Sequence, residues 1–178
     1  SAADQIAFGE DTLRTYGVVV FDRWIEPLRL VGFARPDTVY DPDRAVKKDV
    51  HFGEALALDA HAAISEAVST PATLRIVTRW RTLSSAGKPL KLFVHLADPS
   101  LRPVRQKDKE LRVAADPARR APGSVFLDVA DLFLDAAVPA GEYRLLLGLY
   151  ESPTGPRLAL RPAAADYVEL GRVTVDPF

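Results

Sequence analysis

The sequence predicts an all-β fold, an antiparallel β-sandwich of the jelly-roll or immunoglobulin-like type with about ten strands. Short apolar runs rich in β-branched and aromatic residues recur along the 178-residue chain, and 14 prolines and 10 glycines separate them. Turn signals return at intervals of roughly 8–12 residues, which is typical of a sandwich. Because no Gly/Ser-rich linker divides the sequence, we expect residues 17–178 to form a single domain, preceded by a polar arm over residues 1–16.

The N-terminal third begins with two strand signals. Residues 17–21 (GVVVF) are short and β-branched, and residues 27–34 (PLRLVGFA) alternate in polarity, so both segments predict strands. Residues 41–49 (DPDRAVKKD) combine charges with turn formers and predict a loop. Residues 54–64 (EALALDAHAAI) hold alanines that favour a helix, but their leucines alternate, and we assign the segment to a strand.

The clearest strand pattern lies in residues 72–82 (ATLRIVTRWRT). Large apolar residues and a threonine occupy one face, and three arginines lie on the other, which predicts a half-buried strand. Residues 90–98 (LKLFVHLAD) repeat this alternation with leucines and a valine on one face. Because the turn formers SSAGKP separate the two segments, we expect them to pair as a hairpin.

The C-terminal third holds the remaining strand signals, at residues 125–134, 138–160 and 167–175. In the second of these segments, Gly148 would let a neighbouring strand or aromatic ring approach closely. Gly155 would supply a positive φ in the turn SPTGP. Combining the alternating faces of the strands, we expect five side chains to be buried between two sheets: Trp80, Leu92, Val94, Leu145 and Leu147.

The composition excludes several classes of function. The formal net charge is -1, so no overall field attracts nucleic acid or an anionic membrane, and we predict no nucleic-acid partner. Cysteine is absent, which excludes disulfides, thiolate zinc sites and cysteine nucleophiles. No run approaches the roughly 18 apolar residues of a membrane-spanning helix, so we expect no transmembrane segment in this chain. Because methionine is also absent, we expect a processed protein or an excised fragment.

The three histidines, His51, His61 and His95, are the first candidates for a metal site. A zinc site needs three or four ligands that converge, and neither an H-x-H nor an H-x-x-x-H spacing occurs. His95 lies on the strand face opposite the leucines, and we interpret it as a structural residue. We therefore predict no cofactor and no metal site, although a Ca²⁺ site built from separate loops would leave no sequence signature and stays open.

Catalysis would require acid, base or nucleophilic groups that converge. Asp98 and Asp108 would resemble the carboxylates of a glycosidase if they faced each other across a hairpin. However, Asp98 precedes Pro99 at the start of a turn, where its side chain can cap the turn backbone. Neither a G-x-S-x-G motif nor a phosphate-binding loop occurs. We therefore predict that this chain is not an enzyme.

The aromatic residues offer a different kind of site. Trp24, Trp80, Phe93 and Tyr150 would form a platform for stacking sugar rings if their faces were exposed. Trp80 shares its strand face with core leucine and isoleucine residues, so we expect it to be buried. This leaves Trp24 and Tyr150 as the candidate ligand-binding residues.

Three linked pieces of the sequence resemble a known family. They are residues 74–108, which include LFVHLAD and RPVRQKD, residues 121–134 (APGSVFLDVADLFL), and residues 139–175, which include PAGEYRLLLGLYESPTGPRLAL. Together they resemble the soluble β-sandwich domain that follows the membrane-embedded part of bacterial glycosyltransferase-like proteins of the dolichyl-phosphate-mannose mannosyltransferase type. The turn glycine usual in that family is replaced around Ser100 and Leu101, and its tryptophan before "PG" is absent.

The resemblance implies an accessory domain, because the chemistry of such proteins belongs to the membrane part. We therefore expect a non-catalytic interaction domain of an extracytoplasmic (periplasmic or cell-surface) or membrane-associated bacterial assembly, tethered to a membrane or envelope protein. The alternative is a carbohydrate-binding module that stacks a glycan on exposed aromatic residues. The sequence names neither the ligand nor the partner.

Overall fold

A computed structural model of the chain describes residues 18–26, 28–84, 88–111, 121–162 and 164–176, and the arm expected over residues 1–16 lies outside them. The described residues form strands and one short 3-10 helix, η1 (Pro36–Thr38). The strands are β1 (Val18–Ile25), β2 (Leu28–Ala34), β3 (Val46–Phe52), β4 (Leu56–His61), β5 (Ala67–Ser69), β6 (Ala72–Thr82), β7 (Leu90–Ala97), β8 (Pro103–Glu110), β9 (Val125–Leu134), β10 (Gly141–Glu151), β11 (Leu160–Arg161) and β12 (Val168–Asp176).

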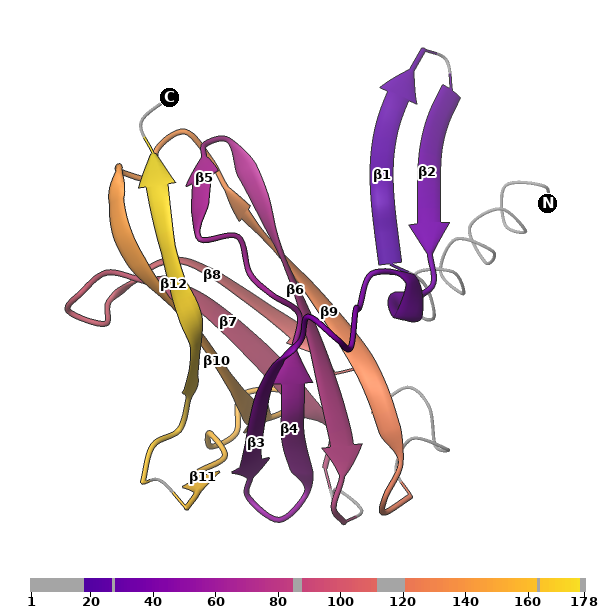
Figure 1. Cartoon of the computed structure of the whole chain (residues 1–178), viewed down its shortest axis with the longest axis vertical. Coiled ribbons are helices and arrows are strands. Elements are labelled where there is room, and N and C mark those ends of the chain that lie inside the picture. The colour runs from indigo at the N-terminus through magenta and orange to yellow at the C-terminus, as the bar shows by residue number, and fades with distance from the viewer. Residues whose placement is uncertain (1–17, 27, 85–87, 112–120, 163, 177–178) are drawn as a thin grey trace.

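Two five-stranded sheets pack face to face, which confirms the predicted β-sandwich (Figure 1). One sheet has the strand order β5-β12-β10-β7-β8, and we call it the β10 sheet. The other has the order β11-β3-β4-β6-β9, and we call it the β6 sheet. Neighbouring strands are antiparallel except for β5, which runs parallel to β12. Strands β1 and β2 form a separate two-stranded sheet that stands beside the sandwich (Figure 1).

The core lies between the two sheets, as the alternating strand patterns predict. The five side chains expected there, Trp80, Leu92, Val94, Leu145 and Leu147, are each no more than 1% exposed. The Trp80 indole is tilted against the ring of Phe52, with a centroid distance of 5.5 Å. Its Nε1–H donates to Thr78 Oγ1 over 2.8 Å, so the one polar atom of the buried indole is paired.

The expected hairpin of residues 72–82 and 90–98 is wrong. Strand β6 pairs with β4 and β9 in one sheet, whereas β7 pairs with β10 and β8 in the other. Both strands have one apolar face, and each buries that face against the opposite sheet. Because stacked sheets lie only about 10 Å apart, the connection over residues 83–89 is long enough to cross between them.

The loop expected over residues 41–49 is correct only in its first half. Strand β3 begins at Val46, which pairs with His61, and Lys47 pairs with Ala60. The charges of this segment predicted a loop, but the strand holds Lys47 and Asp49 at exposed positions and directs the half-buried Lys48 toward the opposite sheet. Lys48 reaches across to β12, where its Nζ donates to the Glu169 carbonyl oxygen over 2.9 Å.

The two glycines predicted to be structural behave differently. A Cβ on Gly148 would lie 2.2 Å from Phe93 Cζ and 2.7 Å from the Asp166 carbonyl oxygen, which confirms the close approach of an aromatic ring. The positive φ expected at Gly155 is wrong, because among the glycines that the structure describes only Gly53, Gly123 and Gly141 have a positive φ. Gly155 is required for space instead, since a Cβ there would lie 2.7 Å from Glu151 Cβ.

Truncation at the centre of the core should lower stability strongly. Leu147→Ala removes a fully buried side chain, and we expect the free energy of unfolding to fall by about 2–5 kcal/mol from lost transfer and the cavity left behind. Urea denaturation measures the effect. Val125→Ala, at an exposed position of β9, serves as the control and should change it by no more than about 0.5 kcal/mol. Equal effects of the two substitutions would contradict the assigned core.

Two glycines on neighbouring strands should respond oppositely to the same added methyl group. Gly148→Ala forces a methyl into Phe93 and the backbone at Asp166, so we expect a loss of about 1–3 kcal/mol in the free energy of unfolding. Gly171→Ala adds the methyl in open space and should be close to neutral or stabilising. Thermal unfolding of the two variants side by side checks the prediction, and a Gly148→Ala variant as stable as wild type would refute it.

Candidate functional site

Tyr150 lies half-buried on the outer face of the β10 sheet. Its hydroxyl donates to Asp108 Oδ2 over 2.9 Å, and its ring centroid lies 6.4 Å from that of Phe93. Burial, followed by the bond to Asp108, raises the pKa of Tyr150 above its usual value. The Phe93 ring is itself covered by the Arg157 guanidinium, 4.4 Å from the ring centroid. Of these residues, the half-buried Tyr150 and the exposed Asp108 are therefore the ones that a ligand could contact.

The other candidate ligand-binding residue, Trp24, belongs to β1 in the separate two-stranded sheet. Its side chain lies outside the described part of the structure, so sugar binding at Trp24 and Tyr150 stays a prediction. Trp80, which we expected in the core, is there.

The two candidate catalytic carboxylates, Asp98 and Asp108, do not lie close together. Asp98 Oδ1 accepts hydrogen bonds from the backbone N–H groups of Ser100 (2.8 Å) and Arg102 (3.0 Å), which confirms the turn cap and lowers the pKa of Asp98. Asp108 pairs with Phe93, five residues before Asp98 along β7. At the rise of an extended strand this separation is about 16 Å, so the two carboxylates do not face each other.

His95 packs against Phe93, with ring centroids 4.7 Å apart. Burial lowers its pKa, and the nearby positive charge of Arg157 lowers the pKa further. Among the described residues no group of three or more His, Asp or Glu side chains is placed to hold a metal ion. None of the described segments forms a helix with the length and apolarity that a membrane crossing demands.

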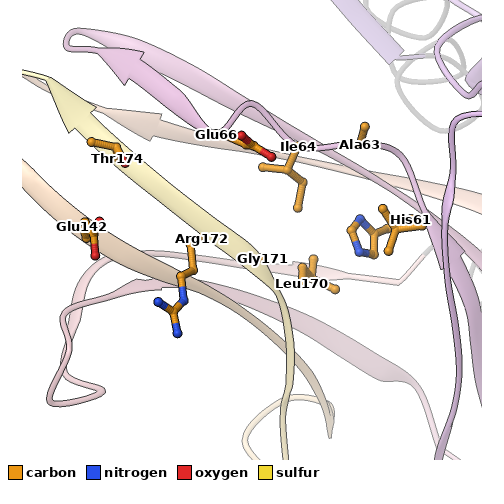
Figure 2. A pocket seen from close by; sticks show the side chains of 10 residues that line it. His61, Ala63, Ile64, Glu66, Glu142, Leu170, Gly171, Arg172 and Thr174 are labelled. Atoms are coloured by element: carbon orange, nitrogen blue, oxygen red, sulfur yellow. The ribbon is translucent and has the colours of Figure 1, made fainter.

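A cleft of about 380 Å³ opens at one side of the sandwich, between β12 and the connection from β4 to β5. We call it the edge cleft. Figure 2 shows the His61 ring and Ile64 in the space beside β12, with Glu66 above it, Arg172 on β12 and Glu142 on the far side of that strand. A smaller hollow of about 260 Å³ shares Glu142 and Arg172 with it. The volume of the edge cleft lies within the usual range for small-ligand sites.

A β-bulge in β4 places His61 at the base of the edge cleft. Leu58 pairs with Trp80 and His61 pairs with Thr78, so a step of three residues along β4 matches a step of two along β6. The register shifts between Leu58 and Ala60, and the extra residue reverses the alternation of faces. His61 therefore points inward and is only 1% exposed, whereas uninterrupted alternation would have placed it on the outer face.

A second bulge, in β12, forms the opposite wall. Leu145 pairs with Gly171 and Leu146 with Glu169, so Leu170 is the extra residue. Gly171 has no side chain to fill the position facing the cleft, and a Cβ built there would meet no atom within 4 Å. A bulge and a glycine therefore coincide where β12 lines the edge cleft.

The His61 ring lies against the backbone of its own strand and of β12. Its Nδ1 lies 2.8 Å from the Ala62 carbonyl oxygen. Because a carbonyl oxygen only accepts, Nδ1 must carry the proton, which leaves a lone pair on Nε2. Burial lowers the pKa of His61, and the backbone carbonyls of Ala62 and Leu170 offset this only in part. The Nε2 atom is buried and has no hydrogen-bond partner.

Charged groups surround the mouth of the edge cleft. Glu66 lies on the β4–β5 connection, Glu142 on β10 and Arg172 on β12. The exposed Arg172 guanidinium has only a loose contact with Glu169, 3.8 Å from Nε to Oε1. The site therefore combines two carboxylates, one guanidinium and a buried acceptor nitrogen around an aliphatic floor.

Comparison with known proteins gives only distant likenesses. No family model matches the sequence, and no curated protein does so either. Among solved structures, the C-terminal domain of wzt is 12% identical with a TM-score of 0.46, covering 78% of this chain and 81% of that one. A β-glucosidase from Listeria innocua in complex with glucose is 12% identical with a TM-score of 0.43, covering 69% of this chain and 16% of that one. At these scores the likenesses carry no argument about function.

Acidification should destabilise the protein through its buried histidines. The pKa values of His61 and His95 are lower in the folded state than the value of about 6.5 expected in the unfolded chain. The unfolded state therefore binds more protons as the pH falls through about 6.5, and stability decreases in that direction. We expect the urea midpoint to fall between pH 7.5 and 5.5, and to fall less in His61→Gln and in His95→Gln. An equal fall in both variants and wild type would contradict this.

Proposed function

We propose that this chain is a non-catalytic accessory domain that binds a membrane or envelope protein of an extracytoplasmic bacterial assembly. The observation that carries the proposal is an apolar surface on the β1–β2 hairpin. Ile25, Leu28 and Leu30 are 59%, 63% and 46% exposed, respectively. Ile25 pairs with Leu28, and Leu30 lies two residues further along β2, so all three share one face of the hairpin. We call it the hairpin face.

Contiguous exposed apolar side chains mark interaction sites, because water is released when a partner covers them. The hairpin face belongs to a two-stranded sheet outside the sandwich, where a partner can reach it (Figure 1). A partner that covered the two leucines would gain about 1.5–3 kcal/mol for each fully buried side chain.

Two further observations support an accessory role. The carboxylates first considered for catalysis already have structural bonds, Asp98 to its turn and Asp108 to Tyr150. The sequence also resembles the soluble domain of mannosyltransferase-type membrane proteins, and the turn where that family has a glycine takes a positive φ at Leu101, 64°. That conformation favours glycine. The absence of catalysis, the extracytoplasmic location and the identity of the partner are parts of this proposal.

Polar substitutions on the hairpin face should abolish partner binding. Leu28→Ser/Leu30→Ser removes most of the apolar area, and we expect recovery of a membrane or envelope protein from detergent-solubilised envelopes to fall at least about tenfold. Phe133→Ser, which changes a side chain 59% exposed on β9, is the matched control and should recover the same protein as wild type. All three proteins should keep the same thermal midpoint.

Equal recovery by wild type and both variants would rule out the hairpin face as the binding surface. Turnover of a glycoside, ester or phosphate substrate that survives repurification would overturn the non-catalytic role.

A further inference from the structure

Strand β9 forms one edge of the β6 sheet, and among the described strands of that sheet it pairs only with β6. Val129 pairs with Val77, whose carbonyl oxygen accepts from the Ala62 N–H on the opposite side of β6. In an antiparallel strand the N–H and C=O of one residue point to the same side. Val77 therefore faces away from β9, and Val129 directs its own N–H and C=O away from β6. An edge of this kind is a template for pairing with another strand.

One side chain from the other sheet reaches this edge. Lys109 Nζ, on β8, donates to the Val129 carbonyl oxygen over 2.9 Å. It also donates to the two carboxylate oxygens of Asp128, at 2.8 and 2.7 Å, so its three N–H groups are all directed to β9. We propose that Lys109 prevents β9 from pairing, strand to strand, with β9 of a second copy of this chain. This inference does not depend on the hairpin face.

A second copy of the chain is the partner that this edge fits. Identical edge strands pair antiparallel about a two-fold axis. If that axis passes through Val129, the two Val129 residues exchange both of their backbone hydrogen bonds, and Val125 of each copy lies opposite Phe133 of the other. Val125 and Phe133 are 46% and 59% exposed. Aromatic and β-branched residues that lie opposite each other stabilise paired strands, so the pairing would cover both exposed side chains.

Lys109 is placed to oppose this pairing. The Val129 carbonyl oxygen, which would accept from the second copy, already accepts from Lys109. An added strand would either displace the ammonium group or cover it. Both changes take a partner or water away from a charge, which is unfavourable. Charged side chains that point inward from an edge strand protect many sheet proteins from edge-to-edge association.

A purely stabilising role explains the arrangement less well. Asp128 is only 1% exposed, so forming its ion pair with Lys109 removes a carboxylate from water. Apolar side chains of similar volume often stabilise a fold as well as such a buried pair does. The bond from Lys109 to the Val129 carbonyl oxygen adds nothing to the charge balance at Asp128, but it occupies the edge.

The other side of the sandwich repeats the arrangement. Strand β5 pairs with β12 only at residues 174–176, so Glu169 lies where β12 has no further strand partner in the described part of the chain. Lys48 Nζ, on β3 in the other sheet, donates to the Glu169 carbonyl oxygen over 2.9 Å. On both sides, therefore, a lysine of one sheet covers an edge carbonyl oxygen of the other.

Self-association of two pair-replacement variants tests the proposal. Lys109→Met/Asp128→Leu replaces both charges with apolar groups, and Lys109→Gln/Asp128→Asn replaces them with neutral polar groups, so neither variant leaves a buried charge unpaired. We expect each to dimerise at least about tenfold more strongly than wild type in sedimentation equilibrium. Amide hydrogen exchange should slow as the concentration rises, and the slowing should be centred on Val129.

Two controls separate the β9 edge from other sources of association. Lys88→Met/Glu151→Leu makes the same apolar substitutions at a surface ion pair and should associate no more than wild type. Phe133→Ser, added to Lys109→Met/Asp128→Leu, removes one half of the cross-strand contact and should lower the association constant at least about fivefold. Association through the hairpin face would affect all of these proteins equally.

Three results would overturn the proposal. The first is wild-type association by the folded pair-replacement variants, or failure of both to fold, which would assign the ion pair to stability alone. If only one of them folds, that one decides. The second is equal association by Lys88→Met/Glu151→Leu, which would indicate general apolar contact. The third is exchange protection centred away from β9, or association that Phe133→Ser leaves unchanged.

Discussion

The structure depends on burying one face of each sheet against the other. The long strands β6, β7 and β10 meet this constraint with apolar side chains along their inward faces, and each large side chain so buried contributes about 1.5–3 kcal/mol. The constraint extends to the edge strands β8 and β9, where the inward positions hold charges. Lys109 Nζ donates to both carboxylate oxygens of Asp128, at 2.8 and 2.7 Å, and to the Val129 carbonyl oxygen. Each charge is tolerated because the opposite sheet supplies its partner.

The edge cleft forms where the alternation is interrupted. A bulge in β4 turns His61 inward, and a bulge in β12 places Gly171 opposite it. A bulge shifts the register and reverses the alternation of faces beyond it, so a polar side chain can take an inward position.

Most outward charges serve the sheets themselves. On the β6 sheet, Arg75 donates to both oxygens of Asp131, and Asp59 accepts from Arg79 and Arg81. Such partly exposed pairs contribute little each, about 0–1 kcal/mol, but they cover the sheet with groups that already have partners. The hairpin face and the edge cleft differ from these surfaces, because the first exposes apolar side chains and the second leaves an acceptor unpaired.

The sequence by itself determined which residues face inward on regular strands. The alternation around Trp80 and Leu147 and the turn capped by Asp98 depend on neighbours close in the chain, and local patterns encode them. The tight fit at Gly148 was indicated only by the glycine itself, because its neighbours Phe93 and Asp166 are distant in the chain. None of the residues of the edge cleft was singled out as a binding residue. His61 was considered only for metal binding, and its inward direction cannot be read from period-two alternation.

Only the tertiary structure decided the partners of β6 and β7, the pairing of Val46 with His61, and the contact between Tyr150 and Asp108. Each joins residues that are distant in sequence, and the choice among partners depends on which arrangement buries every apolar face at once. The bulges have the same origin, because a register shift is defined between two strands. The sequence of one strand does not show where its register with a neighbouring strand shifts. The cleft therefore could not be predicted from the sequence.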